Sequence, residues 1–121
     1  MILSECISGQ WRCFVIPEDV LREAVSRLVR RFRPHKVILF GSQARGNADS
    51  KSDVDLLVVC PLGGRRRRDM MVEMDLALNG LGIARDIVIL TPEEYERDRE
   101  IPGTIARPAF LEGKVLYDRS A

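Results

Sequence analysis

Four residues within a stretch of fifteen have types and spacing suited to phosphate chemistry. The stretch "GSQARGNADSKSDVD", residues 41–55, opens on Gly41 and Ser42 and closes on Asp53 and Asp55. Side chains alternate along a strand, so the two aspartates point to the same side, with their α-carbons roughly 6.5–7 Å apart. Two such carboxylates repel each other unless a cation lies between them. A hard divalent ion such as Mg²⁺ takes oxygen ligands of this kind together with substrate phosphates.

The glycine end of the stretch supplies complementary groups. Gly41 follows the apolar run "KVILF", and a glycine there lets the backbone approach a ligand closely. The N–H groups that open the next helical turn favour an anion, and Ser42 adds a hydroxyl donor. Arg45, about one turn further on, could bind a phosphate oxygen, or could lie on the surface paired with the loop acid Asp49. Together the two ends fit a nucleoside triphosphate with its magnesium ions.

A third carboxylate, Asp86, begins a later apolar run, "RDIVIL". If this run is a strand beside that of Asp55, three acids converge at one end of the sheet. Three acids suffice for a two-metal site, whose ions lie ~3.5–4 Å apart and bind the attacking and leaving oxygens of a phosphoryl transfer. A glycine turn or a pair of aspartates alone is most often only a turn or a solvated strand edge. The spacing, combined with Asp86, favours the functional interpretation.

The elements that must position these residues alternate along the chain. Apolar periodicity predicts helices at 17–32, 65–82 and 92–100 and a short helix before Gly113. Strands are predicted at 36–40, 53–60, 85–90 and 114–117, and one helical turn at 42–46. Thr91 before Pro92 is a typical N-cap followed by proline at the first helical position. Alternating strands and helices around one sheet indicate an α/β or α+β domain.

Composition narrows the possible functions. The chain has 121 residues, enough for one domain, and 19 Lys+Arg against 18 Asp+Glu give a net charge of +1. A protein that binds nucleic acid over a wide surface is normally far more basic, so nucleic acid is not expected as the main partner. No run is long and apolar enough for a membrane helix, and three cysteines without paired spacing fit a reducing cytoplasm. Residues 1–16 are expected to form a loosely attached arm on a domain spanning 17–121.

The run Arg65–Arg68 is the longest unbroken run of positive charge in the sequence. Four cations at a helix start oppose the helix dipole, so local stability does not explain them. They could contact RNA, a polyphosphate tail or an acidic partner. The simpler interpretation is a solvated loop and helix start, and the sequence favours it slightly.

The spacing Gly41-Ser42, ten residues, then Asp53-Val54-Asp55 resembles the GS-x10-DxD signature of the DNA polymerase β-like nucleotidyltransferases. The surrounding "FGSQARGNADSKSDVDLLVV", and later "RDIVILTPEE" and "LEGKVLYDR", are similar to the minimal nucleotidyltransferases, often encoded beside a HEPN-domain protein. The resemblance covers residues 17 to 119. It implies a small mixed sheet flanked by helices, with Gly41 and Ser42 holding the β- and γ-phosphates of ATP. It also implies that Asp53 and Asp55 bind both of two Mg²⁺ ions, and that Asp86 completes one metal site and helps deprotonate the acceptor.

The resemblance also implies a partner, because minimal members lack the helical domain with which larger relatives hold base and acceptor. Members of this kind are antitoxins of HEPN ribonuclease toxins, and some transfer AMP to a tyrosine of the toxin. The leading hypothesis is therefore a Mg²⁺-dependent adenylyltransferase antitoxin in a hetero-oligomer with its toxin. The alternative is a binding module that neutralises the toxin by complex formation alone. Transfer to a small molecule or to an RNA end is a third possibility.

Overall fold

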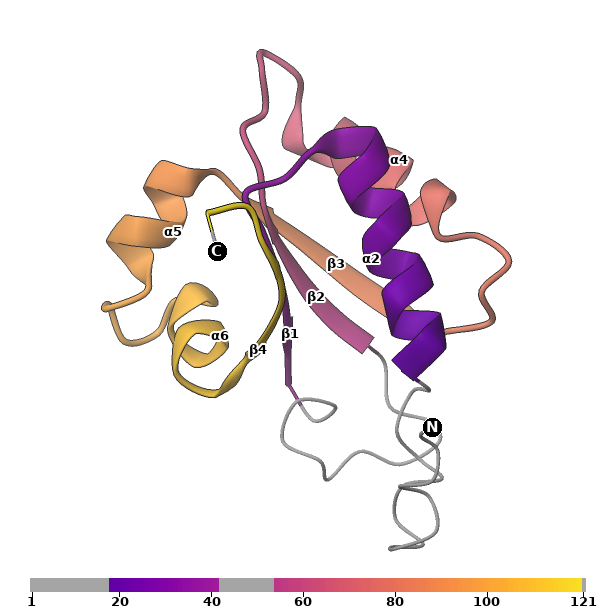
Figure 1. Cartoon of the computed structure of the whole chain (residues 1–121). Helices are drawn as coiled ribbons and strands as arrows, with labels where there is room; N and C mark the ends of the chain where they lie inside the picture. Colours follow the sequence, from indigo (N-terminus) through magenta and orange to yellow (C-terminus); the bar gives the residue numbers. More distant parts are fainter. Residues whose placement is uncertain (1–17, 42–53, 121) are drawn as a thin grey trace, which may run out of the picture.

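The computed structural model describes residues 18–41 and 54–120, and Figure 1 shows their arrangement. These residues form four helices and four strands. In chain order they are α2 (Glu18–Phe32), β1 (Lys36–Phe40), β2 (Val54–Val59), α4 (Arg67–Ala77), β3 (Arg85–Leu90), α5 (Pro92–Asp98), α6 (Ala106–Glu112) and β4 (Lys114–Asp118). The predicted α+β class is confirmed.

The four strands form one mixed sheet in the order β3-β2-β1-β4. β1 is antiparallel to both β2 and β4, whereas β2 and β3 run parallel. The end of β1 and the starts of β2 and β3 therefore meet at the same end of the sheet. This is the end at which the sequence places Gly41, Asp55 and Asp86.

Helices cover both faces of the sheet (Figure 1). On one face α2 and α4 pack through Leu28 and Met74 against side chains such as Leu56 and Ile89. On the other face α5 and α6 pack through Tyr95 and Ala109 against Leu57 and its neighbours. Both faces of the central strands are thus buried, which explains why β2 reads as a nearly continuous apolar run rather than an alternating one.

Local signals in the sequence account for the helix ends. α2 begins with Glu18 and Asp19 and ends with Arg30 and Arg31, so the charges at each end have the sign that the helix dipole favours there. α5 begins with a full capping box: the Thr91 hydroxyl accepts from the Glu94 amide and the Glu94 carboxylate accepts from the Thr91 amide. The predicted N-cap at Thr91 is confirmed.

The predicted helix over 65–82 is too long at both ends. α4 starts at Arg67, because Arg66 is extended with φ −75° and ψ 140°, and it ends at Ala77. Gly80 and Gly82 then adopt φ values of 89° and 73°, in the left-handed region that a right-handed helix cannot continue through. No helix in the described residues combines the length and apolar character needed to cross a bilayer.

Candidate active site

Asp55 and Asp86 lie side by side across the two parallel strands. In the β2–β3 register the Cα partner of Asp55 is Asp86. Directly paired residues of neighbouring strands point to the same face, and the strands are about 4.8 Å apart. The condition set by the sequence, that β3 must neighbour β2, is therefore met. Two of the three predicted carboxylates come together at the expected end of the sheet.

The alternation along β2 decides which face carries Asp55. Val54, Leu56 and Val58, whose side chains alternate with that of Asp55, are fully buried against α2 and α4. Asp55 shares the opposite face with Leu57 and Val59, which are buried beneath α5 and α6. Asp55 is half-buried and Asp86 exposed, so the carboxylate pair emerges where the cover of these two helices ends.

Gly41 lies against the Asp55 side chain. Its φ of 79° is in the left-handed region, and a Cβ built on it would overlap Asp55 Oδ2 and lie 3.2 Å from Asp55 Cγ. A glycine is required here for two separate reasons, its backbone conformation and the close approach of the carboxylate. The glycine end and the carboxylate end of the predicted site are therefore in direct contact.

Phe40 is a site residue that the motif did not reveal. It is the register partner of Asp55 on β1, and it packs, half-buried, at the margin of the core under α5 and α6. Asp55 consequently has an aromatic side chain on one flank and Asp86 on the other. The signal was present in the alternation of "KVILF", which puts Phe40 and Ile38 on one face once the pairing with β2 is known.

Arg85 precedes Asp86 in the chain but does not neutralise it. Strand alternation turns Arg85 toward α4, where its Nε lies 2.9 Å from Asp75 Oδ1 and its Nη2 donates to the Asp75 carbonyl at 2.7 Å. Its side chain is only 12% exposed. The positive charge nearest in sequence to Asp86 is thus directed to the other face of the sheet.

Three predicted site residues, Ser42, Arg45 and Asp53, lie outside the described residues, as does Asp49. Within the parts that are described, no group of three or more metal-ligating side chains gathers. Two carboxylates side by side nevertheless provide hard oxygen ligands. These suit a divalent ion that takes its remaining ligands from water and phosphate. The metal and phosphate roles of these residues stay predictions.

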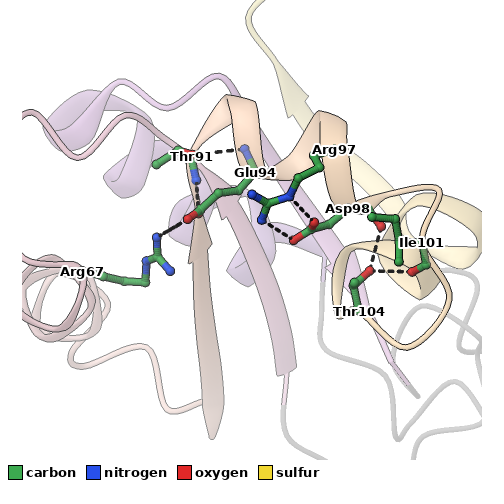
Figure 2. Close-up of polar contacts among 7 residues, drawn as sticks. All are labelled: Arg67, Thr91, Glu94, Arg97, Asp98, Ile101 and Thr104. Atoms are coloured by element: carbon green, nitrogen blue, oxygen red, sulfur yellow. Dashed lines mark hydrogen bonds and ion pairs between the residues drawn. The ribbon is translucent and has the colours of Figure 1, made fainter.

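The arginine run lies at the opposite end of the sheet from Asp55 and Asp86. It follows the end of β2, and Arg67 donates to both carboxylate oxygens of Glu94 at 2.8 and 2.7 Å, directly after the end of β3 (Figure 2). Arg65 pairs with Glu73, and Arg66 with Asp69. Three of the four cations therefore have intramolecular partners, which supports the simpler interpretation of the run as a solvated helix start.

Comparison with known proteins supports the same chemistry. The family model for the nucleotidyltransferase domain matches residues 19–116, which includes every described helix and strand in whole or in part. A Methanocaldococcus jannaschii protein named "Putative protein adenylyltransferase MJ0604" is 29% identical over 102 residues, covering 83% of this chain and 97% of that protein. A Sulfolobus solfataricus protein, described as "a putative nucleotidyltransferase", shares the fold with a TM-score of 0.60 at 22% identity. That match covers 84% of this chain and 80% of the other.

Proposed function

Because the chain belongs to the nucleotidyltransferase domain family and is a nucleotidyltransferase enzyme, we propose that it transfers AMP from ATP to a protein hydroxyl. The observation that carries this proposal is the pairing of Asp55 with Asp86 beside Gly41. The relative named as a protein adenylyltransferase supports both the adenylyl group and a protein acceptor. The expected reaction site is the sheet end where β1 finishes and β2 and β3 begin.

The transfer is a displacement at the α-phosphorus of ATP. The acceptor oxygen forms a bond to this phosphorus, the bond to the oxygen bridging the α- and β-phosphates breaks, and pyrophosphate leaves with the electron pair. The acceptor proton passes to the Asp86 carboxylate and from there to water. Catalysis rests on positioning and on neutralising the phosphate charge, because phosphoryl transfer needs little covalent help from the protein.

The proposed binding groups divide between the two ends of residues 41–55. Gly41 and Ser42 would donate to the β- and γ-phosphates, and Arg45 to a phosphate oxygen. Asp53, Asp55 and Asp86 would hold two Mg²⁺ ions. When bound, the ions would offset the charge of the phosphates and of the leaving pyrophosphate.

The proposed acceptor is a tyrosine of a cognate HEPN ribonuclease toxin, which would make this protein an antitoxin in a hetero-oligomer with it. This part of the proposal rests on the resemblance to minimal nucleotidyltransferases. The described residues form the sheet and its four covering helices. The proposal assigns acceptor recognition to the surface around Asp86 and to the partner itself. We place the reaction in the cytoplasm, where ATP, Mg²⁺ and a ribonuclease target are present together.

A transfer assay tests the proposal directly. The protein is incubated with Mg²⁺, labelled ATP and the HEPN protein encoded beside it, and the HEPN protein is examined by mass spectrometry for added AMP. We expect modification of a tyrosine, and loss of modification with Asp53→Asn combined with Asp55→Asn. If none of the four nucleoside triphosphates is transferred while the complex still silences the ribonuclease, the protein is an antitoxin that acts by binding alone.

A further inference from the structure

β3 is an edge strand whose outer backbone groups face away from the sheet. The Ala84 and Leu90 carbonyls accept from β2 and from Cys60 after it, at 2.8 and 2.9 Å. Backbone groups alternate sides along a strand, so the N–H and C=O groups of Arg85, Ile87 and Ile89 point outward. Among the described residues no strand pairs with this edge.

The two edges of the sheet differ in how they are protected. β4, the other edge strand, starts with a lysine and carries a register irregularity opposite Val37 and Ile38. Bulges and lysines are the devices by which edge strands avoid pairing with other chains. β3 keeps an unbroken register with β2 over all six of its residues and contains neither lysine nor proline. Its two charged residues are the first two, of which Arg85 is held against Asp75 on one face of the sheet, so the remaining four positions are apolar. Its outer edge is therefore suited to accept another strand.

An ion pair lies at the C-terminal end of β3, where it leaves less room for an added strand. The Arg67–Glu94 ion pair joins α4, which packs on one face of β3, to α5, which packs near the other (Figure 2). Because the sheet separates the two helices, the pair passes around the end of β3. An added strand would accordingly lie along the first part of β3, from Arg85 to Ile89, which includes Asp86.

An added strand would place one of its residues directly beside Asp86. It would lie about 4.8 Å from β3, and the residue paired with Asp86 would point to the same face as Asp86 and Asp55. We propose that the acceptor enters as an extended segment that adds to the outer edge of β3, with its hydroxyl residue beside Asp86. This inference rests on the proposed function and specifies its substrate: a tyrosine in a strand-forming segment, recognised mainly through its backbone.

Amide hydrogen exchange measured by NMR tests this proposal without altering the protein. The full chain is compared alone and in complex with the intact HEPN toxin, Mg²⁺ and a non-hydrolysable ATP analogue. We expect the outward amides of Ile87 and Ile89 to exchange about tenfold or more slowly in the complex. The amides of Val88 and Leu90, already directed at β2, provide the internal control.

A substitution gives a second, kinetic test. Arg85→Pro removes an outward N–H at the first residue of an edge strand, where proline is tolerated. Arg85→Ala is the reference, because both variants lose the contact with Asp75 but only the proline lacks the N–H. We expect kcat/KM for the toxin to be about fivefold lower in the proline variant than in the alanine variant, and KM for ATP to be equal in the two.

The outcomes separate this inference from the proposed function. Unchanged exchange at Ile87 and Ile89, or equal kinetics of the two variants, in a protein that does transfer AMP would overturn the strand model alone. Protection of these amides in the free protein that grows with its concentration would show that a second copy occupies the edge, which also overturns it. A wild-type protein that transfers nothing would remove both proposals.

Discussion

The backbone of Gly41 lies against the carboxylate of Asp55, so closely that a Cβ on Gly41 would overlap Asp55 Oδ2. The contact arises because Phe40 pairs with Asp55 and Gly41 follows at once. The group proposed to bind phosphate and a group proposed to bind metal are therefore adjacent. A nucleotide bound here would meet the proposed phosphate-binding group at Gly41 and the proposed metal-binding group at Asp55 next to each other.

Gly41→Ala should lower both stability and AMP transfer. The alanine would be strained at φ 79°, at a cost of about 1–2 kcal/mol, and would also collide with Asp55. In an Asp55→Ala background the collision is removed, because the nearest remaining atom is the Asp55 Cβ at 3.5 Å, while the strain persists. Urea unfolding of the four proteins in this double-mutant cycle measures the two contributions separately.

Gly63→Ala is the matched control for Gly41→Ala. Gly63 has a similar φ of 62°, but a Cβ there would meet nothing within 4 Å. Gly63→Ala should lower the free energy of unfolding by the backbone strain alone and leave the transfer rate unchanged. The contact between Gly41 and Asp55 would be unimportant if both substitutions lowered the free energy of unfolding equally and if Asp55→Ala did not change the effect of Gly41→Ala.

Asp86→Asn should abolish activity without harming the fold. Removing one of two neighbouring like charges relieves repulsion, so the free energy of unfolding should stay equal or rise by up to about 1 kcal/mol. Transfer of AMP should fall by about a thousandfold, since charge neutralisation and acceptor deprotonation are both weakened. Labelled-ATP kinetics and urea unfolding check the two expectations, with the exposed Glu100→Gln as a neutral control. A variant that unfolds would make Asp86 a structural residue.

The helices and strands that carry the site, and the face on which Asp55 lies, could be predicted from the sequence because apolar periodicity and strand alternation are local properties. The type of each element is right throughout the described residues, and Asp55 lies on the face opposite to Leu56, as expected. The sequence places Asp86 beside Asp55 only on the condition that their strands are neighbours, since strand order depends on long-range packing. Nothing within "DVDLLVV" or "RDIVIL" specifies which strands pair.

Other features depended on tertiary structure and were missed for that reason. Leu57 and Val59 share a face with Asp55 yet are buried, because α5 and α6 fold back over that face. The helix 67–77 was predicted too long, since apolar periodicity continues through Leu78 and Leu81 while Gly80 and Gly82 end the helical backbone. The outer edge of β3 is visible only when the order of all four strands is known.

Glu94 should make the stability depend on pH. Its hydrogen bond from the Thr91 amide, and then that from Arg67, hold the pKa of its carboxyl below the usual value. A depressed pKa means that the stabilisation is present above the unfolded-state pKa and is lost as pH falls through the folded-state value. Glu94→Gln should therefore lower the free energy of unfolding by about 1 kcal/mol at pH 7, and by progressively less below about pH 4. Denaturant unfolding across this range measures the difference.

Glu93→Gln is the control for this pH dependence. Glu93 lies beside Glu94 in the first turn of α5 but is exposed, so its removal tests the general effect of losing an acid near the helix N-terminus. We expect a change of a few tenths of a kcal/mol. A difference for Glu94→Gln that stayed constant from pH 7 to pH 3 would mean that its charge contributes nothing to the capping interaction.

The arginine run should be dispensable for the reaction. Asp55 and the end of β2 at Val59 are four residues apart, roughly 13 Å along the strand, and the run begins beyond that end. Arg66→Gln combined with Arg68→Gln leaves the Arg67–Glu94 pair intact, so the fold should persist. We expect KM for ATP, KM for the toxin and the transfer rate to stay within about twofold at both low and physiological salt, where screening differs. A tenfold loss that shrinks as salt is added would instead place these arginines in contact with an anionic substrate or partner.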